Sequence, residues 1–321
     1  MNSYVHVAVG VIRDLENKVL LAKRRDEAHQ GGLWEFPGGK VEADESVQVA
    51  LRRELAEELG IHLTHSLPLI QVRHHYSDKS VLLDVWEIDS YRGSPRGNEG
   101  QPLQWLPADQ LETGTDCLYP LPAANAAIIK ALQLPHALLI TGEFDSKADF
   151  QARLERALRG GIRLVQFRPC RSTDALSEFE LKKLLEFAAA LCLQHQARLV
   201  VSASIGLAPT ASQGVHLPAK QLMACRNRPV SAKQLLGASC HNREELQQAA
   251  ELEVDYVVLS PVSRTVSHPG VEPLGWEQFE SLVKTVNIPV FALGGLSQTD
   301  LPKARTMGGQ GIAAISALWE M

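Results

Sequence analysis

The sequence lacks any long apolar run. No stretch of its 321 residues approaches the roughly 20 uncharged apolar residues that a membrane helix needs. Residues 1–6 also lack the basic and apolar blocks of a signal peptide. We therefore expect a cytoplasmic protein that has no membrane as a partner.

Paired cysteines are missing as well. The five cysteines, Cys117, Cys170, Cys192, Cys225 and Cys240, are scattered, odd in number and form no CxxC pair. This pattern indicates neither a disulfide framework nor a cysteine zinc site. We expect free thiols that are mostly buried.

Clusters of Lys and Arg are absent too. Residues 1–134 hold 13 basic and 19 acidic residues, a net charge of -6, which leaves +1 for the rest of the chain's -5. An acidic first half argues against polymeric nucleic acid as a partner, because phosphate contacts need basic clusters. A phosphorylated small molecule stays open, provided that metal ions invert the local field.

What the sequence does contain is an ordinary globular composition, 45% hydrophobic and 21% charged, at a length that predicts about two domains. Before residue 134 we expect strands and helices in a mixed arrangement, with the 19–22 strand pairing with the 6–12 strand as a hairpin. Pro135 breaks the chain and sets the predicted boundary between domains 1–133 and 134–321. The predicted strands are 6–12, 19–22 and 81–86, and the predicted helices are 46–59 and 123–132.

Beyond residue 136, short apolar runs alternate with amphipathic helical segments. Eight such strands in about 186 residues fit a compact (β/α)8 barrel of the TIM type, so the chain is predicted to be α/β throughout. The predicted strands are 137–140, 163–167, 198–202, 214–217, 235–239, 256–259, 290–293 and 311–315.

One motif dominates the first half. It runs from Gly39 through Glu45 to the segment 53–61, Arg-Glu-Leu-Ala-Glu-Glu-Leu-Gly-Ile. At helical spacing, an apolar stripe lies beside a face that carries three carboxylates, which repel one another unless a cation neutralises them. Oxygen ligands of high charge suit Mg²⁺ or Mn²⁺. The stripe is Val47, Leu51, Leu55 and Leu59, and the carboxylates are Glu54, Glu57 and Glu58.

Two neighbours complete this predicted site. Arg53 can pair with Glu57 one helical turn later and orient a ligand, and the Gly38–Gly39 turn can offer a carbonyl to a metal. The alternative is that the Glu-rich face is only a solvated surface. Because every fixed position of a long pattern is filled, we favour a functional site.

At these residues the sequence resembles the Nudix hydrolase family, whose box G-x5-E-x7-R-E-U-x-E-E-x-G-U is matched completely. The resemblance implies an α/β/α sandwich with a mixed sheet, and metal-dependent attack of water on a diphosphate. It also implies that the Gly38 carbonyl, Glu57 and Glu58 bind metal and that Glu54 is a metal-associated general base. Glu99, from a loop, is implied as a further metal ligand or as the base instead.

Within that family the surroundings are similar to MutT-type 8-oxo-dGTP diphosphatases, from about Val5 to Leu132. The resemblance implies that Arg25, His29 and the run Glu35-Phe36-Pro37-Gly38 contact the nucleotide, and that Asn125 reads the oxidised purine edge. An Asn amide offers a donor and an acceptor, so it suits that task. The alternatives are a surface cation for Arg25, a loop histidine for His29 and a helix cap for Asn125. The implied reaction releases pyrophosphate and leaves the monophosphate.

The second half resembles thiamine-phosphate synthase and its TenI-like relatives. The turn at Gly294–Gly295 and the segment Ile315–Ser316 lie where such barrels bind phosphate through backbone N–H groups, so a phosphorylated thiamine-pathway ligand is implied. The alternative is that these glycines only close the barrel.

The barrel departs from that family where the chemistry is expected. Arg168-Pro169-Cys170 lacks the expected Lys, Ser202-Ala203 and Pro218–Gln221 lack both metal-binding carboxylates, and Ser267-His268 replaces Thr-Lys. Without charge neutralisation we expect no synthase activity. His216, His241 and His268 could serve another acid–base step, although a structural role is favoured for each.

Two alternatives remain open at this stage. The fusion could make the first domain a hydrolase of thiamine-related pyrophosphates instead of nucleotides. The barrel, in turn, could be a binding module for a phosphorylated metabolite or a residual thiamine-pathway enzyme.

Overall fold

The chain folds into two compact units, one up to Gln133 and one from Leu134 onward. The computed structural model describes residues 4–27, 29–113, 117–169, 176–207, 213–265, 270 and 272–320. Within these ranges, no helix combines the length and the apolar character needed to cross a bilayer.

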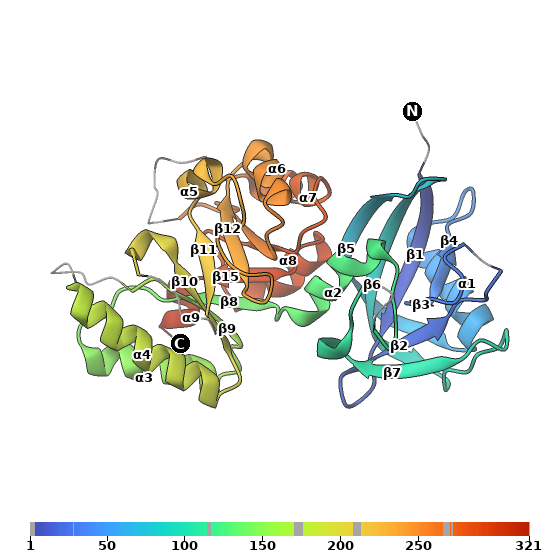
Figure 1. Cartoon of the computed structure of the whole chain (residues 1–321), viewed down its shortest axis with the longest axis horizontal. Helices are drawn as coiled ribbons and strands as arrows, with labels where there is room; N and C mark the ends of the chain where they lie inside the picture. Colours follow the sequence, from blue (N-terminus) through green and yellow to red (C-terminus); the bar gives the residue numbers. More distant parts are fainter. Residues whose placement is uncertain are drawn as a thin grey trace. The chain divides into compact units, whose positions relative to one another are not determined.

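The first unit contains two sheets (Figure 1). The larger is mixed, with strand order β4-β1-β6-β5, because β1 and β6 run parallel while β1–β4 and β5–β6 are antiparallel. The smaller, of order β3-β2-β7, is antiparallel. The strands are β1 (Val5–Ile12), β2 (Lys18–Lys23), β3 (Trp34–Glu35), β4 (Gly38–Lys40), β5 (His62–His75), β6 (Ser80–Arg92) and β7 (Leu103–Pro107).

The predicted hairpin between the first two strands is wrong in its pairing. β2 lies between β3 and β7 in the smaller sheet, and only an isolated bridge, Arg13 to Val19, joins it to the end of β1. The 6–12 strand instead pairs with β6 and β4. Sequence proximity favoured the hairpin, but the parallel partner β6 lies about 75 residues further along, where no local pattern points to it.

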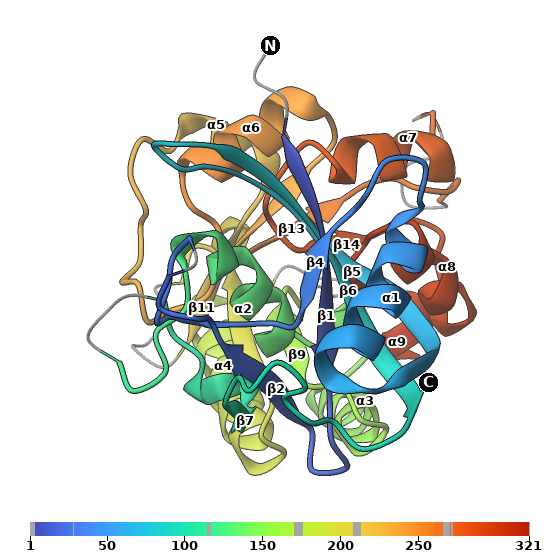
Figure 2. The ribbon, with the colours of Figure 1, turned by 90° about the vertical axis from the view of Figure 1, so that its right-hand side faces the viewer.

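Two helices cover opposite faces of the larger sheet. Successive residues of β1 alternate between two cores: Ala8 and Ile12 join the core under α1 (Val47–Leu59), and Val9 joins the core under α2 (Ala126–Gln133). Figure 2 shows α1 lying against the strands. The predicted α/β/α sandwich is therefore confirmed. Two short 3-10 turns lie between β7 and α2 in the chain: η1 (Ala108–Gln110) and η2 (Ala123–Asn125).

The second unit is a closed parallel barrel of order β10-β11-β12-β13-β14-β15-β8-β9. It confirms the predicted TIM-type barrel, and each predicted strand agrees with the observed one to within one residue at either end. The strands are β8 (Ala137–Ile140), β9 (Leu164–Phe167), β10 (Arg198–Ser202), β11 (Gly214–Leu217), β12 (Leu236–Cys240), β13 (Tyr256–Leu259), β14 (Val290–Ala292) and β15 (Gly311–Ala314).

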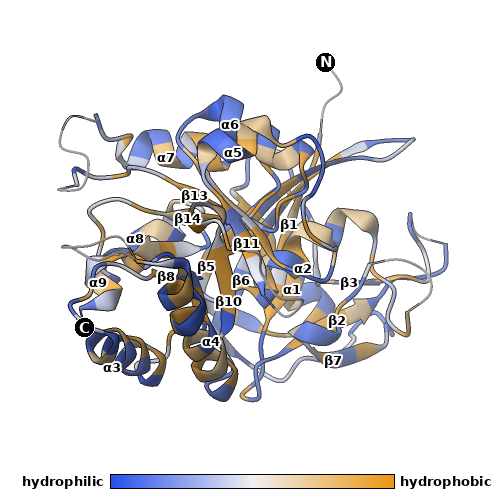
Figure 3. Cartoon of the chain, turned by 60° about the vertical axis from the view of Figure 1, so that its left-hand side comes forward, coloured by the Kyte–Doolittle hydropathy of each residue, from blue (hydrophilic) through white to orange (hydrophobic). Residues whose placement is uncertain are grey.

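Amphipathic helices pack their apolar sides against these strands. Figure 3 shows hydrophobic colour on the barrel strands and alternating polar and apolar segments along α3 and α4. The helices are α3 (Lys147–Arg159), α4 (Glu178–Gln194), α5 (Ala219–Ala224), α6 (Arg243–Glu251), α7 (Gly275–Val283), α8 (Leu301–Thr306) and α9 (Ser316–Trp319), with the 3-10 turns η3 (Ala203–Ile205) and η4 (Gln298–Asp300).

The described cysteines are free thiols. Cys192 and Cys240 are buried, and Cys117 and Cys225 are partly exposed, while Cys170 lies outside the described residues. Burial raises the pKa of Cys192 to about 12, so this thiol stays protonated and unreactive.

Candidate active site

The carboxylate-bearing helix is fixed at both ends by its own sequence. The Ser46 side chain accepts a hydrogen bond from the Val49 N–H at 3.3 Å and so caps the start of α1. At the other end Gly60 adopts a left-handed conformation, φ 66°, that closes the helix. Leu51, Leu55 and Leu59 are fully buried, so the helix cannot rotate and its acidic face has a fixed direction.

Two glycines let strand β4 lie directly on that acidic face. A Cβ atom at Gly39 would lie 2.1 Å from the Glu54 carboxyl carbon, and one at Gly38 (φ +144°) would lie 2.1 Å from the Ala8 carbonyl oxygen. The Gly38 N–H donates to Glu58 Oε2 at 3.2 Å. The glycines are therefore needed for close approach between the strand and the carboxylates.

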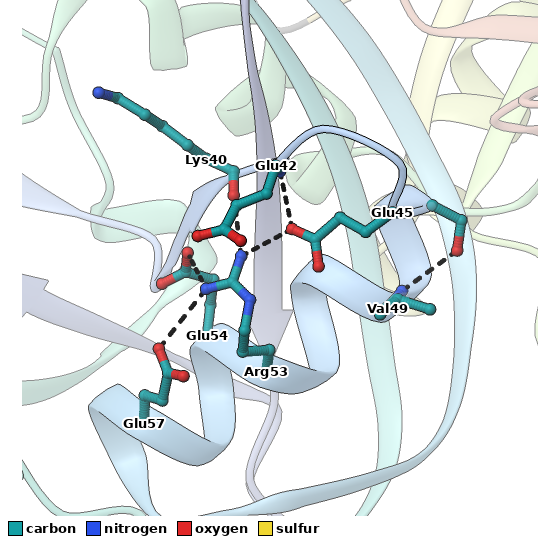
Figure 4. Close-up of polar contacts among 8 residues, drawn as sticks. Lys40, Glu42, Glu45, Val49, Arg53, Glu54 and Glu57 are labelled. Carbon is teal, nitrogen blue, oxygen red and sulfur yellow. Dashed lines mark hydrogen bonds and ion pairs between the residues drawn. The ribbon is translucent and has the colours of Figure 1, made fainter.

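Arg53 organises the helix side of the site (Figure 4). Its guanidinium donates to Glu45 Oε1 and to Glu54 Oε1, both at 2.7 Å, and to the Lys40 carbonyl at 3.1 Å. The predicted contact with Glu57 is present but is the longest, at 3.5 Å. Hydrogen bonds to Glu45 and Glu54 raise the pKa of Arg53 above its ordinary value, so its charge is permanent. Arg53 thus fixes the orientation of the Glu54 carboxylate.

A loop brings a further carboxylate to this place. Asn98 Nδ2 donates to the Glu57 carbonyl at 3.0 Å and Gln101 Nε2 to the Glu58 carbonyl at 3.1 Å, so the loop satisfies the free carbonyls at the end of α1. Between them, Glu99 meets Arg25, whose Nη2 donates to the Glu99 carbonyl at 3.1 Å. The predicted loop carboxylate is therefore anchored to the helix that bears the others.

Four carboxylates repel one another at this site. Burial, with the neighbouring charges of Glu35, Glu54 and Glu99 and against the hydrogen bond from Gly38, raises the pKa of Glu58 to about 8. Burial also raises the pKa of Glu35 to about 7, against the opposing charge of its ion-pair partner Arg24. Bare carboxylates are disfavoured here, and a hard cation with oxygen ligands would remove the repulsion.

The predicted metal ligands do not form a ready-made cluster. Among the described residues, no three His, Cys, Asp or Glu side chains are close enough together to hold a metal ion as they lie. Glu57 is 61% exposed and contacts Arg53 at the rim. The donor chemistry and the charge fit a divalent cation, and binding one requires these side chains to rotate towards it.

A pH dependence follows for the metal-free protein. The pKa values of Glu35 and Glu58 are higher in the folded protein than in the unfolded chain. The protonated carboxyl groups therefore contribute folding stability that is fully present below the unfolded pKa. This stability is lost as pH rises through about 7 for Glu35 and about 8 for Glu58. A cation takes the place of these protons, so Mg²⁺ should raise the melting temperature more at about pH 8 than at about pH 5. Thermal unfolding in EDTA and in MgCl2 at both pH values measures this. Equal stabilisation at the two values, or a larger one in acid, would contradict it.

A second group of side chains lies around the turn between β5 and β6. His29 Nδ1 is 3.3 Å from Asp78 Oδ2, its ring packs edge-on to Tyr76 with centroids 5.0 Å apart, and its Nε2 is buried with no hydrogen-bond partner. Asn125 is only 6% exposed and ends the 3-10 turn η2 that leads into α2. A buried polar atom without a partner is costly, so His29 Nε2 is a candidate for contact with a ligand.

At the C-terminal ends of the barrel strands, polar side chains replace acidic ones. β10 ends at Ser202, which is buried and hydrogen-bonds Ser204 at 2.8 Å, and β11 is followed by Pro218. Arg168 is exposed after β9, with its backbone N–H bonded to the Thr141 hydroxyl at 2.7 Å.

Comparison with known proteins assigns the two units. A family model for the NUDIX domain matches residues 8–131, and a model for thiamine monophosphate synthase (TMP-TENI) matches residues 137–318. This chain belongs to both families, one in each unit. The first unit is a Nudix hydrolase domain, and members of this family generally use divalent metal ions.

Three curated relatives illustrate the match, each over one half of the chain. The 8-oxo-dGTP diphosphatase of Escherichia coli (strain K12) is 33% identical over 129 residues, 40% of this chain and 96% of that protein. The CTP pyrophosphohydrolase of the same organism is 38% identical over 124 residues, 38% of this chain and 87% of that protein. The thiamine-phosphate synthase of Synechococcus sp. (strain WH7803) is 34% identical over 168 residues, 52% of this chain and only 46% of that protein, so the chain spans about half of it.

Within the Nudix domain, the predicted nucleotide contacts separate into two groups. Glu35, His29 and Asn125 carry polar side chains at the positions described above, whereas Phe36 is 3% exposed and packs in the core under α2. Burial thus leaves the Phe36 side chain little surface for a ligand. Pro37 is buried too, with its carbonyl accepting from the Gly10 N–H at 2.8 Å.

Sequence reasoning missed three residues of this domain. Arg24, and not only Arg25, enters the site, where it pairs with Glu35; Arg25 is 63% exposed. Glu45 holds Arg53, and Tyr76 packs on His29. Glu45 was visible as a fixed position of the box, but no local pattern distinguishes Arg24 from Arg25 or marks Tyr76.

In the TMP-TENI domain, His216 is a structural residue. Its Nδ1 lies 3.2 Å from the Tyr256 hydroxyl and its Nε2 2.9 Å from the Ser239 hydroxyl, and its side chain is buried. Burial lowers the pKa of His216 to about 3, so it stays neutral. His241 is exposed and hydrogen-bonds the Ser260 carbonyl at 2.8 Å through Nδ1. His268, Ser267 and Cys170 lie outside the described residues.

The predicted phosphate-binding segments of this domain have a tight backbone. A Cβ atom at Gly294 would lie 2.8 Å from Pro261 Cα, and one at Gly295 would lie 2.3 Å from the Arg264 carbonyl oxygen. Both glycines have positive φ, so they are needed to pack the turn after β14 against the segment after β13. Ser316 is exposed at the start of the four-residue helix α9, next to Ile315. Barrel closure alone accounts for the two glycines, and phosphate binding there stays a prediction.

Proposed function

We propose that the Nudix domain hydrolyses 8-oxo-dGTP to 8-oxo-dGMP and pyrophosphate, with Mg²⁺, and so removes a damaged nucleotide before a polymerase uses it. The observation that carries this proposal is Asn125: an amide side chain on a residue that is only 6% exposed, in the same domain as the acidic box. Such an amide can donate to one atom of a purine edge and accept from another. The similarity to an 8-oxo-dGTP diphosphatase supports the same substrate.

The carboxylates of the acidic box have two proposed roles, metal binding and proton transfer. Glu54, Glu57, Glu58, Glu99 and the Gly38 carbonyl would hold Mg²⁺, or Mn²⁺ in its place, which when bound polarises the phosphoryl oxygens and neutralises the leaving pyrophosphate. Glu54 accepts the proton of the attacking water, and Arg53 keeps the Glu54 carboxylate in place through its 2.7 Å hydrogen bond. Glu99, held by a loop and Arg25, is the rival proton acceptor.

Substrate recognition is assigned to residues outside the acidic box. Asn125 reads the base, and the partnerless Nε2 of His29 is available to the nucleotide. Glu35, which pairs with Arg24, is close enough to the acidic box for its charge to raise the pKa of Glu58. Arg24 neutralises the charge of Glu35, so this carboxylate repels a polyanionic substrate less.

Two other substrate classes are tested beside this one. The similarity to a CTP pyrophosphohydrolase favours a pyrimidine nucleotide, and the fusion to a TMP-TENI domain favours a thiamine-related pyrophosphate. Phosphate or pyrophosphate release from 8-oxo-dGTP, dGTP, CTP and thiamine diphosphate, compared as kcat/KM, separates the three.

For the barrel we propose binding of a phosphorylated thiamine-pathway ligand without synthase turnover. Ser202, Ala203 and Pro218 stand where carboxylates would have to hold Mg²⁺ for displacement of pyrophosphate. We expect no thiamine phosphate from the aminopyrimidine diphosphate and the thiazole phosphate under Mg²⁺, and a calorimetric binding signal with thiamine phosphate. Product formation would overturn the loss of catalysis; absence of any binding would overturn the ligand role.

A further inference from the structure

Glu99 is held by other side chains at both of its backbone polar groups. Its N–H donates to Gln101 Oε1 at 2.9 Å, and its carbonyl accepts from Arg25 Nη2 at 3.1 Å. A tight turn encloses it as well, because the Gly100 N–H donates to the Gly97 carbonyl at 2.9 Å. The Glu99 side chain is 52% exposed, and exposed loops are ordinarily the more mobile parts of a protein. The three hydrogen bonds therefore give residue 99 a fixed place that its exposure alone would not give.

Arg25 reaches this loop from a different part of the chain. It lies two residues after the end of β2, where the Lys23 N–H donates to the Pro102 carbonyl at 3.0 Å. The end of β2 and the Glu99 loop are thus already bonded to each other before Arg25 bridges them. On its other flank the loop bonds the carbonyls at the end of α1, as described above. Arg25 therefore connects β2 to a loop that is itself fastened to the acidic helix.

The contact geometry favours the backbone of Glu99 over its carboxylate. Arg25 Nη2 lies 3.1 Å from the Glu99 carbonyl oxygen but 3.5 Å from Oε2. The first contact is a hydrogen bond of ordinary length. The second is an ion pair between side chains that are 63% and 52% exposed, and such pairs contribute little to stability. A guanidinium placed in this way fixes residue 99 and still allows its carboxylate to turn towards a cation or a water molecule.

We infer that Arg25 is a positioning residue for Glu99: its guanidinium holds the Glu99 carbonyl and so places the loop carboxylate beside the acidic helix. This inference rests on the proposed role of Glu99 as a metal ligand or proton acceptor. It gives Arg25 a different role from the nucleotide contact that the sequence implies. A nucleotide contact acts on substrate binding, whereas a positioning residue acts on the step that needs the Glu99 carboxylate.

The first test is kinetic and uses the full chain with Mg²⁺ and the nucleotide that the wild type hydrolyses best. Arg25→Met keeps most of the length of the side chain but removes its charge and its donors. Its kcat should fall by about 3- to 10-fold, as expected for one hydrogen bond, while KM changes by less than about twofold. Arg25→Lys keeps the charge and a donor, so kcat should recover in part. Arg52→Met, the same change at an exposed arginine of α1, should match the wild type.

The second test does not depend on turnover. Hydrogen exchange of the metal-free chain reports how firmly the loop is held, because the Glu99 and Gly100 N–H groups are both hydrogen-bonded within it. These two groups should exchange faster in Arg25→Met than in the wild type, and at the wild-type rate in Arg52→Met. Unchanged exchange in Arg25→Met would overturn the inference, because the guanidinium would then not hold the loop.

Combining Arg25→Met with Glu99→Gln tests whether Arg25 acts through Glu99. The double variant should turn over no more slowly than Glu99→Gln alone, because the benefit of positioning is already lost with the carboxylate. Additive losses would overturn the inference. A KM that rises in Arg25→Met while kcat stays the same would also overturn it and would make Arg25 a nucleotide contact.

The proposed function and this inference fail in different ways. A wild-type preference for CTP or a thiamine compound overturns the 8-oxo-dGTP proposal but leaves the role of Arg25 intact, because the acidic box and Glu99 would serve any of these diphosphates. Unchanged turnover in Glu99→Gln overturns the role of Glu99 in hydrolysis and with it the positioning role of Arg25, even if exchange in the loop is faster in Arg25→Met.

Discussion

Replacing Glu54 by Gln should lower kcat/KM for nucleotide hydrolysis by about 10²–10⁴-fold, the usual loss when a positioned proton acceptor is removed. The amide cannot take the proton of the attacking water, but it can still accept the hydrogen bond from Arg53, and it has the same size beside Gly39. The fold should therefore be retained. Steady-state kinetics with Mg²⁺ and thermal unfolding of the same samples measure both parts.

The matched control is Glu16→Gln, at an exposed glutamate that pairs with Lys18 outside the site, and its activity should equal that of the wild type. Glu99→Gln decides between the two candidate bases. If Glu99→Gln costs more in kcat than Glu54→Gln and also removes the acidic limb of the pH profile, Glu99 and not Glu54 is the proton acceptor. Unchanged turnover in Glu54→Gln would refute its assignment outright.

Replacing Asn125 by Ala should reduce the preference for 8-oxo-dGTP over dGTP by about 10- to 100-fold, because a buried recognition group that hydrogen-bonds only one of two substrates sets their ratio. Asn125→Asp tests the chemistry more finely, since it keeps the shape and the acceptor but removes the donor. Both variants should retain kcat for dGTP.

Gln133→Ala serves as the control, at an exposed position at the end of the following helix α2, where the side chain bonds the Ala108 carbonyl. It should keep the wild-type preference. If Asn125→Ala keeps the preference as well, the amide does not read the base.

Local patterns predicted most of the fold. The barrel strands were found because each is a short apolar run between amphipathic helices, and α1 was found because Ser46, its leucine stripe and Gly60 together mark the start, the buried face and the end of a helix. The partner of β2 was missed because strand pairing depends on contacts between distant segments. Its true neighbour β7 begins at Leu103, more than 80 residues later.

In the site, too, residues on one helix could be predicted from their spacing, and residues brought together by the fold could not. The acidic box lies on one helix, so its spacing alone predicts that Glu54, Glu57 and Glu58 share a face. The ion pair of Arg24 with Glu35 and the edge-on packing of Tyr76 on His29 are tertiary contacts, and no spacing encodes them. The exposure of Glu57 and the burial of Phe36 also depend on packing, which a family pattern does not display.

The most direct test of the account is hydrolysis by the wild-type chain with Mg²⁺, measured as pyrophosphate release from 8-oxo-dGTP, dGTP and CTP and as phosphate release from the aminopyrimidine diphosphate and thiamine diphosphate, compared as kcat/KM. The account predicts a strong preference for 8-oxo-dGTP over every other compound. Comparable or higher rates on the thiamine compounds would contradict it and would make the TMP-TENI domain the better guide to the substrate.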